Sequence, residues 1–271
     1  MNKTILITGC SSGIGRMTAK YFQEKGWNVV ATVRKFSDSD AELTDLGNVL
    51  VTELDVTKED TIKSTVEQAV AKFGTIDVLL NNAGYGSYGI LESTPENKIR
   101  MQFEVNVIGL LLVTKNIIPV MRKQGSGIII NISSMGGKIT FPMGTLYHGS
   151  KFAVEGMSEA LSYELAEIGI QVKMIEPGVI NTNFATSSFD LNIDPAITEY
   201  KEFTNKVLQA FEAGVKGSEP VLVAETIYKA ATDGTSQLRY IAGPDAEQII
   251  AARKQMNDED YLALIRSQYG L

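Results

Sequence analysis

The sequence predicts an α/β fold in which one doubly wound, mostly parallel sheet of seven strands carries helices on both faces. Two observations predict it. Short apolar runs rich in β-branched residues alternate with stretches of helical periodicity along all 271 residues, which is the pattern of strand–helix–strand units. Several runs are continuously apolar, as expected of parallel strands that are buried on both faces. No repeat, low-complexity tract or linker divides the chain, so we expect a single domain over residues 1–271.

Seven apolar runs are the expected strands, and the segments between them are the expected helices. The strands are predicted at residues 3–8, 28–33, 49–54, 76–80, 127–133, 170–175 and 238–242. Apolar side chains at helical spacing form one stripe from Phe103 to Met121 and another from Val154 to Leu165. Each stripe gives its helix one apolar face to lay on the sheet. Right-handed crossovers between parallel strands then wind the helices onto both faces.

One irregular region interrupts the alternation after the sixth strand. Residues 181–195 are rich in Asn, Thr and Ser, a helix-like stretch follows at 197–211, and Gly214 and Gly217 mark a loop. Ligands of open α/β sheets bind at the carboxyl ends of the strands. We therefore predict that residues 184–217 form a lid over a site at that edge.

Composition excludes several classes of function. Lys and Arg number 25 against 32 Asp and Glu, which gives a formal charge of −7, so a nucleic-acid partner is not expected. The single Cys10 excludes an intrachain disulfide, and with the single His148 it cannot build a Cys/His zinc site. We predict no metal. No uncharged apolar run approaches the roughly 18 residues of a membrane span, and the N-terminal run is too short for a signal peptide. We expect a cytoplasmic protein with no membrane partner.

A glycine-rich turn follows the first strand and leads into a helix. It reads Thr-Gly-Cys-Ser-Ser-Gly-Ile-Gly from Thr8 to Gly15. Glycines allow the sharp turn and bring backbone N–H groups against a pyrophosphate, which the positive end of the helix dipole favours. We therefore predict a Rossmann-type dinucleotide site. Its predicted contacts are Gly9, Ser11, Ser12, Gly13, Ile14 and Gly15.

Two other motifs fit this turn less well. The run Gly-Cys-Ser-Ser-Gly matches the G-x-S-x-G nucleophile elbow, which would make Ser11 a hydrolase nucleophile with His148 as its base. An elbow needs an earlier strand to supply the second oxyanion N–H group, and no strand precedes this one. A P-loop needs Gly-Lys followed by Ser or Thr, and this turn has no such run.

The end of the second strand predicts which dinucleotide binds. An NAD site places Asp or Glu there to hold the adenosine ribose 2′-OH, whereas this strand ends in Val33 followed by Arg34 and Lys35. A guanidinium at that place pairs with a 2′-phosphate, so we predict that NADP(H) is favoured over NAD(H). The alternative is a pair of solvated loop charges. After the third strand, Asp55 and Val56 are predicted to contact the adenine, with a simple turn as the alternative for Asp55.

A phenol and an ammonium lie on one predicted helix face. Tyr147 and Lys151 are four residues apart, which places them side by side on a helix. An ammonium near a phenol lowers the pKa of the tyrosine, so Tyr147 is a candidate acid and base for a carbonyl or alcohol oxygen. Further polar groups fall at strand ends or in the helix after one. They are residues 81–84, Asn106, Ser134, Pro177, Gly178 and Thr182.

Together these motifs resemble the short-chain dehydrogenase/reductase family, from about residue 3 to residue 183 and more loosely beyond. Thr8, Gly9, Gly13 and Gly15 match the family's glycine pattern, and residues 81–84 match its Asn-Asn-Ala-Gly. Its catalytic Asn, Ser, Tyr and Lys are matched by Asn106, Ser134, Tyr147 and Lys151. Its Pro-Gly pair and its nicotinamide-contacting Thr are matched by Pro177, Gly178 and Thr182. The glycine turn, with Ala-Thr-Val-Arg at the second strand, is similar to members acting on hydroxysteroids, retinoids and other bulky apolar alcohols or ketones.

The resemblance implies hydride transfer between a nicotinamide and a carbonyl or alcohol carbon. Tyr147 would protonate the carbonyl oxygen during reduction, and Ser134 would donate a hydrogen bond to it. Lys151 would hold the nicotinamide ribose hydroxyls and lower the Tyr147 pKa. Asn106 would hold a water that links Lys151 to solvent. Asn82, Ala83 and Gly84 would contact the cofactor, the first two near its adenosine and mostly through backbone.

The expected substrate is an apolar small-molecule ketone or alcohol, because residues 184–211 supply aromatic and aliphatic side chains for a pocket. The candidates are Phe184, Phe189, Leu191, Ile193, Phe203, Leu208 and Phe211. In the family, helices such as those expected about residues 95–122 and 150–167 pair across a twofold axis, which implies a homodimer or homotetramer. His148 and Cys10 are expected to be structural.

Two other functions are compatible with this fold class. A non-catalytic NADP-sensing or scaffold protein would usually lack the Tyr or the Lys, and both are present here. A sugar-nucleotide epimerase or dehydratase of the extended relatives would have a differently spaced glycine turn and a larger C-terminal substrate domain. The sequence favours the oxidoreductase.

Overall fold

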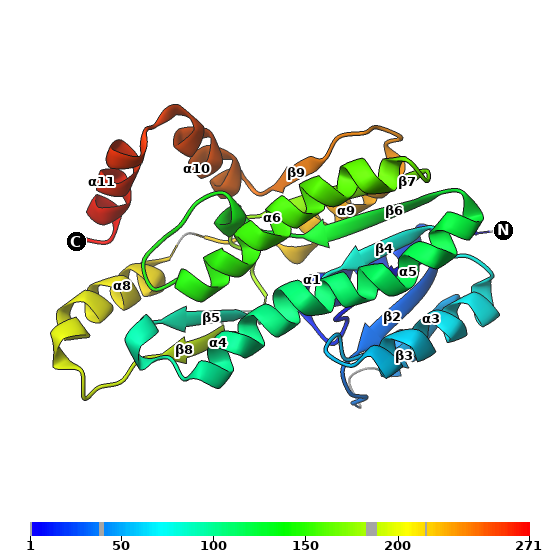
Figure 1. Ribbon diagram of the computed structural model, residues 1–271, viewed down its shortest axis with the longest axis horizontal. Coiled ribbons are helices and arrows are strands. Elements are labelled where there is room, and N and C mark those ends of the chain that lie inside the picture. The colour runs from blue at the N-terminus through cyan, green and yellow to red at the C-terminus, as the bar shows by residue number, and fades with distance from the viewer. Residues whose placement is uncertain (1, 38–40, 183–188, 215) are drawn as a thin grey trace.

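Seven parallel strands form the central sheet of the computed structural model, which describes residues 2–37, 41–182, 189–214 and 216–271 (Figure 1). The strands are β1 (Thr4–Ile7), β2 (Asn28–Val33), β3 (Val49–Glu53), β4 (Val78–Asn81), β6 (Gly127–Ile132), β7 (Ile170–Pro177) and β9 (Arg239–Ala242). Their order is β3-β2-β1-β4-β6-β7-β9, and every neighbouring pair is parallel. The predicted fold is confirmed, and each strand begins and ends within two residues of its predicted bounds.

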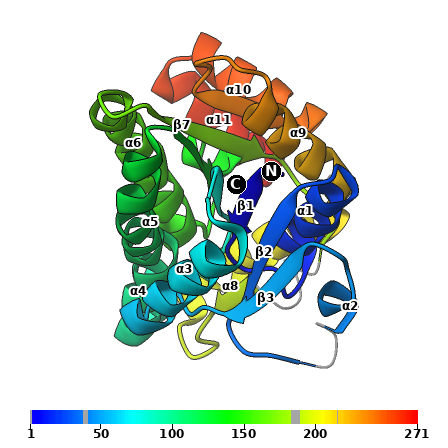
Figure 2. The ribbon, with the colours of Figure 1, turned by 90° about the vertical axis from the view of Figure 1, so that its right-hand side faces the viewer.

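Helices cover both faces of the sheet, as predicted (Figure 2). On one face, α1 (Gly13–Glu24), α2 (Ala41–Thr44) and α9 (Pro220–Thr232) pack on the sheet through buried residues such as Phe22, Leu43 and Ile227. On the other, α3 (Glu59–Phe73), α5 (Leu110–Gln124) and α6 (Thr145–Ala166) do so through Ile62 and Ile117 among others. The switch in strand order falls between β1 and β4, which is where ligands of such sheets bind.

A second, two-stranded sheet joins the segment that follows β7, where the lid is predicted, to the segment after β4. In it β5 (Gly86–Gly89) pairs in parallel with β8 (Phe189–Asn192). The expectation of irregular chain over 181–195 is therefore wrong for β8. Neither segment has the composition of a strand, and the pairing depends on a contact between distant residues. A Cβ at Gly89 would lie 2.0 Å from the Asn192 carbonyl oxygen, and Gly89 has a φ of +139°, so only glycine fits this pairing.

The helix-like stretch of the lid forms as expected, with a 3₁₀ turn η5 (Thr198–Tyr200) followed by α8 (Lys201–Ala213). Residues 184–188 and 215 of the predicted lid lie outside the described residues, and so does the candidate pocket residue Phe184. Two C-terminal helices, α10 (Pro244–Gln255) and α11 (Asp258–Gln268), complete the chain. The Tyr261 hydroxyl of α11 donates to the Thr140 carbonyl at 3.2 Å, which brings the C-terminus beside the carboxyl edge of the sheet.

One long helix combines α4 (Glu96–Phe103), the π-helical turn η3 (Glu104–Gly109) and α5. By length and composition it could cross a membrane, with a mean hydropathy of 1.5 over its most apolar window. The charged residues Glu104 and Lys115 interrupt it, so it contains no uncharged run of spanning length. Val113, Ile117 and Met121 on its inner face are fully buried against the sheet. This face belongs to the protein core.

Candidate active site

The glycine turn brings β1, β2 and the start of α1 together. Gly9 and Gly13 have φ values of +75° and +57°, which favour glycine. A Cβ at Gly15 would lie 2.3 Å from the Gly9 carbonyl oxygen and 2.5 Å from Asn82 Nδ2, so a side chain is excluded there. The Cys10 N–H donates to the Thr32 carbonyl at 2.7 Å. The turn thus leaves Ser11, Ser12, Gly13 and Ile14 at the N-terminus of α1, partly or fully exposed. This arrangement fits a pyrophosphate.

Asn82 and Ala83 anchor this turn. The Asn82 side-chain amide donates to the carbonyls of Thr8 at 2.8 Å and Gly9 at 3.0 Å. In return Thr8 Oγ1 accepts from the backbone N–H groups of Asn82 at 2.9 Å and Ala83 at 3.0 Å. The prediction that Asn82 contributes mostly backbone to the cofactor misses this function of its side chain, which holds the turn in shape.

The predicted adenosine-side residues lie where β2 and β3 end. Arg34 and Lys35 are exposed directly after β2, and among the described residues neither makes a hydrogen bond or ion pair that would divert it from a ligand. Asp55 Oδ1 accepts from both the backbone N–H (3.0 Å) and the hydroxyl (2.8 Å) of Thr57. The Asp55 side chain thus closes the turn after β3, and its contact with the adenine stays a prediction. Val56 is buried against the Gly109 backbone.

Ser134, Tyr147 and Lys151 meet at the end of β6. Ser134 caps the short 3₁₀ turn η4 (Met135–Gly137), and its Oγ accepts from the Gly136 N–H at 3.0 Å. Tyr147 and Lys151 come from the first two turns of α6, and the Tyr147 and Ser134 side chains are hydrogen-bonded. Lys151 Nζ lies 5.8 Å from the centre of the Tyr147 ring and donates to the Ile132 carbonyl at 2.8 Å.

Burial controls the protonation of this group. It raises the pKa of Tyr147, and the hydrogen bond from Ser134 opposes that rise. Burial also lowers the pKa of Lys151 to about 8, with Glu155 opposing. The expectation that Lys151 lowers the Tyr147 pKa is therefore wrong for this arrangement, because the ammonium is turned toward the Ile132 carbonyl and Ser134 is the group that favours the phenolate.

Asn106 lies in the π-helical turn η3, a conformation that often marks functional sites. Its amide donates to the Tyr85 carbonyl at 2.8 Å and to Ser150 Oγ at 3.2 Å, and its Oδ1 accepts from the Tyr85 N–H at 3.1 Å. The side chain thus fixes the chain after Gly84, where a Cβ would lie 3.1 Å from Asn106 Oδ1. The predicted water site stays a prediction, and the amide atoms are already engaged.

The segment after β7 is held by a residue that sequence reasoning missed. Asp245 of α10 accepts from the Val179 N–H at 2.7 Å. A Cβ at Gly178 would lie 2.2 Å from its carboxylate, which explains the glycine after Pro177. Thr182 lies near the glycine turn, since a Cβ at Gly13 would be 3.6 Å from its side chain. The sequence contains no local signal for Asp245, because it is more than 60 residues away from the loop it supports.

Aromatic side chains from the second sheet and the lid stand beside Tyr147. Tyr88 of β5 stacks on Tyr147, with ring centres 5.2 Å apart, and on Phe189 of β8 at 4.8 Å. Phe211 of α8 meets Tyr88 edge-on at 6.3 Å and Tyr269 at 5.9 Å. Of the other candidate pocket residues, Ile193, Phe203 and Leu208 pack in the same cluster, whereas Leu191 is 40% exposed. Sequence reasoning missed Tyr88 and Tyr269.

His148 and Cys10 are placed as structural residues. His148 Nδ1 lies 2.9 Å from the Gly136 carbonyl, and Nε2 accepts from the Phe141 N–H at 3.1 Å. Burial lowers the pKa of His148, so the ring is neutral, and its two hydrogen bonds hold the loop after Ser134 in place. Cys10 is fully buried in the core between β1 and α1.

Comparisons with known proteins agree with this geometry. The family described as short chain dehydrogenase matches residues 3–192. An uncharacterized oxidoreductase of Schizosaccharomyces pombe is 46% identical over 84% of this chain and 96% of its own. A 3-ketodihydrosphingosine reductase of Bacteroides thetaiotaomicron is 36% identical over 92% of this chain and 91% of its own.

Solved structures of the same fold cover most of the chain. A short-chain dehydrogenase from Streptomyces avermitilis aligns with a TM-score of 0.82 at 32% identity, covering all of this chain and 97% of its own. The protein ElxO with NADP bound aligns with a TM-score of 0.73 at 28% identity, covering 89% and 98%. A 3-ketoacyl-(acyl-carrier-protein) reductase from Brucella melitensis complexed with NADH aligns with a TM-score of 0.76 at 25% identity, covering 90% and 98%.

Proposed function

Because the chain belongs to the short chain dehydrogenase family, we propose that it is an NADP(H)-dependent oxidoreductase that interconverts a ketone and a secondary alcohol, with Tyr147 as the general acid and base. The observation that carries the proposal is the group formed by the hydrogen-bonded Ser134 and Tyr147 with Lys151, at the carboxyl edge of the sheet and beneath an aromatic wall. Oxidoreductase activity follows from membership of the family.

The residues present fit a nicotinamide dinucleotide. The glycine turn would hold the pyrophosphate, Arg34 and Lys35 the adenosine ribose phosphate, and Lys151 the ribose on the nicotinamide side. When bound, the nicotinamide supplies or accepts the hydride. The two exposed bases after β2 favour a 2′-phosphate over a free hydroxyl because the strand end offers a charge-assisted contact and no carboxylate.

Tyr147 and Ser134 would act on the substrate oxygen. Burial raises the pKa of Tyr147, which keeps the phenol protonated at neutral pH and ready to donate its proton to a carbonyl oxygen. Ser134 would donate a second hydrogen bond to that oxygen and stabilise its developing negative charge. In the alcohol direction Tyr147, as the phenolate, would receive the hydroxyl proton, while Ser134 would keep its hydrogen bond to the same oxygen.

An apolar, bulky ketone is the proposed substrate. Tyr88 stacks on the Tyr147 ring, and Phe189 and Phe211 pack against Tyr88 in turn. These aromatic side chains offer little to a charged or highly hydroxylated molecule. The relative from Bacteroides thetaiotaomicron is named for a ketone with a long apolar chain. We therefore include a 3-keto long-chain amine beside steroid and retinoid ketones in the substrate panel.

The first experiment measures NADPH oxidation across a panel of apolar, sugar and keto-acid carbonyls. Tyr147→Phe should lose turnover by at least about 10²–10⁴-fold, the usual contribution of a positioned general acid, with cofactor affinity nearly unchanged. Tyr163→Phe is the matched control, since Tyr163 lies on the same helix and is 71% exposed. Near wild-type turnover in Tyr147→Phe would refute the mechanism, and a preference for free sugars or keto acids would refute the substrate class.

The second experiment measures cofactor choice. Arg34→Ala should raise the KM for NADPH by roughly ten- to a hundredfold, the effect of losing one charge-assisted contact, and leave NADH little changed. Arg122→Ala, an exposed arginine on α5, serves as control. Equal kcat/KM for the two cofactors in the wild type would show that Arg34 is only a solvated loop charge.

We also propose that the protein self-associates through its long helices. Met101 and Ile108 on the α4–α5 helix and Phe152 on α6 are between 41% and 49% exposed. Large apolar side chains at this exposure on two neighbouring helices suit an isologous interface. Light scattering that gives a concentration-independent monomer would contradict it.

A further inference from the structure

A cluster of buried charges lies beneath the proposed catalytic group. Glu155 of α6 and Glu176 of β7 are 5% and 2% exposed, values at which an ionised carboxylate needs a partner. Both belong to the elements that carry the site. Glu155 is one helical turn after Lys151, and Glu176 directly precedes Pro177 and Gly178.

The two carboxyl groups converge on one guanidinium nitrogen, since Arg239 Nε lies 2.9 Å from Glu155 Oε2 and 3.5 Å from Glu176 Oε1. Two buried carboxylates that share one donor repel each other, and a proton held by one of them relieves this repulsion. Oε1 of each residue is buried and has no hydrogen-bond partner among the described residues. The pair therefore holds fewer donors than two carboxylates require, and one of the two is best accommodated as the neutral acid.

The surrounding cations do not supply the missing donors. Arg239 of β9 donates through Nε to Glu155 at 2.9 Å and through an Nη to the more exposed Glu159 at 2.5 Å, and its Nε is 3.5 Å from Glu176. Lys138, after the Ser134 turn, lies 3.5 Å from Glu155. On the β6 side the buried Ser133 hydroxyl has no partner in the described structure. Among the described residues, the ion pair of Glu176 is thus the 3.5 Å contact with Arg239, a cation that Glu155 and Glu159 share.

The cluster reaches Lys151 through α6 and the Ser134 turn. A Cβ at Gly137 would lie 2.9 Å from Glu155 Cγ and 3.0 Å from the Lys151 carbonyl, so the Glu155 side chain passes directly under this turn. Glu155 is also the group that raises the pKa of Lys151 against its burial. The charge of the carboxyl pair therefore affects the pKa of the Lys151 ammonium.

We propose that Glu155 and Glu176 form a one-proton store that sets the charge of Lys151, and so act as positioning residues for the reaction. The role of the pair in the reaction rests on the proposed function, whereas its electrostatic effect on the Lys151 pKa does not. Burial and the neighbouring carboxylate raise the pKa of Glu176 to about 7, close to the value of about 8 for Lys151. When the pair releases its proton, it gains a negative charge that keeps Lys151 protonated to higher pH.

The test is a pH titration of Lys151 by NMR of lysine labelled at Cε and Nζ, with the signal assigned by its loss in Lys151→Arg. Glu176→Gln cannot ionise, so Lys151 should titrate about one pH unit lower than in the wild type, the effect of one charge at intermediate dielectric. Glu155→Gln should shift the titration in the same direction. Glu159→Gln is the matched control, because it contacts the same Arg239 from one turn further along α6 and should leave Lys151 unchanged.

Two further readouts separate the store from its effect on catalysis. Infrared spectra of the wild type and of Glu159→Gln should show the carbonyl stretch of a protonated carboxyl, and this band should disappear as pH rises through about 7. Glu176→Gln should lack the band at every pH. The alkaline limb of the kcat/KM profile should move with the Lys151 titration. Absence of the infrared band, or superimposable Lys151 titrations in all variants, would overturn the proposal. If no carbonyl is reduced, the proposed function fails, and the NMR and infrared results still decide the inference. Should Glu176→Gln not fold, Glu155→Gln gives the same Lys151 comparison.

Discussion

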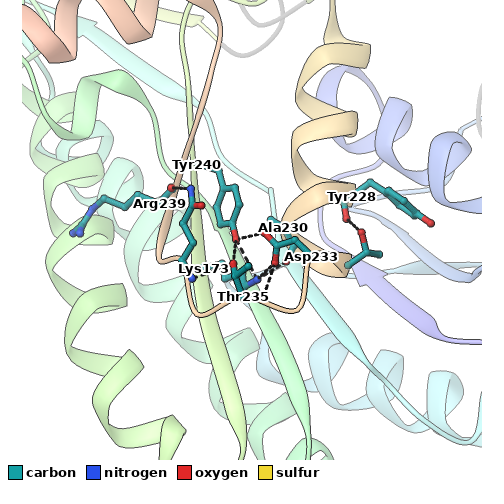
Figure 3. Close-up of polar contacts among 9 residues, drawn as sticks. Lys173, Tyr228, Ala230, Asp233, Thr235, Arg239 and Tyr240 are labelled. Atoms are coloured by element: carbon teal, nitrogen blue, oxygen red, sulfur yellow. Dashed lines mark hydrogen bonds and ion pairs between the residues drawn. The ribbon is translucent and has the colours of Figure 1, made fainter.

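Strands β7 and β9 carry a buried charge cluster on each of their two faces. On the α9 face, Lys173 is 1% exposed and donates to the Ala230 carbonyl at 2.7 Å, Asp233 at 2.9 Å and the Tyr240 hydroxyl at 3.2 Å (Figure 3). Tyr240 in turn donates to Asp233 at 2.7 Å. On the α6 face, Arg239 forms ion pairs with Glu155, Glu159 and Glu176. Figure 3 shows Arg239 and Tyr240, neighbours in sequence, directed to opposite sides of the strand.

The two clusters differ in how completely their polar atoms are paired. All three protons of the Lys173 ammonium have acceptors, and the Asp233 carboxylate accepts from Lys173, Tyr240 and the Thr235 N–H. The pKa of Asp233 is lowered in consequence, against the effect of burial. In the Glu155–Glu176 pair, two buried oxygens have no hydrogen-bond partner among the described residues. A fully paired cluster stabilises one charge state, whereas an underpaired one can take up or release a proton near neutral pH.

The largest effect that sharpens this contrast is expected from Lys173→Met. Removing the cation leaves a carboxylate and a hydroxyl without their partner in a buried site, which costs about 3–5 kcal/mol of stability. Turnover of the folded protein should be unchanged, because the cluster lies away from the carboxyl edge. Urea unfolding measures the loss, with Lys254→Met at an exposed lysine of α10 as control. A loss below about 1 kcal/mol would mean that the Lys173 cluster is not a structural tie.

A smaller effect is expected in the pH dependence of stability. Glu176 has a folded-state pKa of about 7 against an ordinary value of 4.5, so the unfolded state releases its proton first and stability falls as pH rises from about 4.5 to about 7. Asp233 has the opposite sign, since its pKa is lowered and its contribution is lost as pH falls below the ordinary 3.8. The melting temperature of the wild type should fall as pH rises from about 4.5 to about 7, and this fall should be absent in Glu176→Gln. The decrease in melting temperature below about pH 3.8 should be weaker in Asp233→Asn. An unchanged slope between about pH 4.5 and 7 in Glu176→Gln would assign that titration elsewhere.

The smallest effect is expected from Tyr240→Phe. The variant removes one hydroxyl that donates to Asp233 and accepts from Lys173, while the ion pair between those residues stays. The free energy of unfolding should fall by about 1–2 kcal/mol. The Lys151 titration and the infrared band should match the wild type, because Tyr240 faces the α9 side. A shift in either would show that the two clusters communicate through β9, and the contrast between them would not hold.

Much of the site could be predicted from local sequence. The glycine turn, the four-residue spacing of Tyr147 and Lys151 and the polar ends of β4, β6 and β7 each depend on a few consecutive residues. Hydrophobic periodicity located the strands because a buried parallel strand is apolar on both faces. The structure of the segment after β7 was predicted only in outline, since the pairing of β5 with β8 joins segments about a hundred residues apart that have no strand-like composition.

The sequence by itself determined the fold class, the strand positions and the residues of the proposed catalytic group, because short-range spacing and periodicity encode them. Only the tertiary structure decided the surroundings of that group. Asp245 under the Gly178 loop, Tyr88 on Tyr147 and Glu176 beside Glu155 are contacts between residues far apart in the chain. The structure also reversed the expected direction of the pKa shift at Tyr147, where burial outweighs the hydrogen bond from Ser134. A pKa depends on desolvation and on distances between charges, and both exist only after the chain has folded.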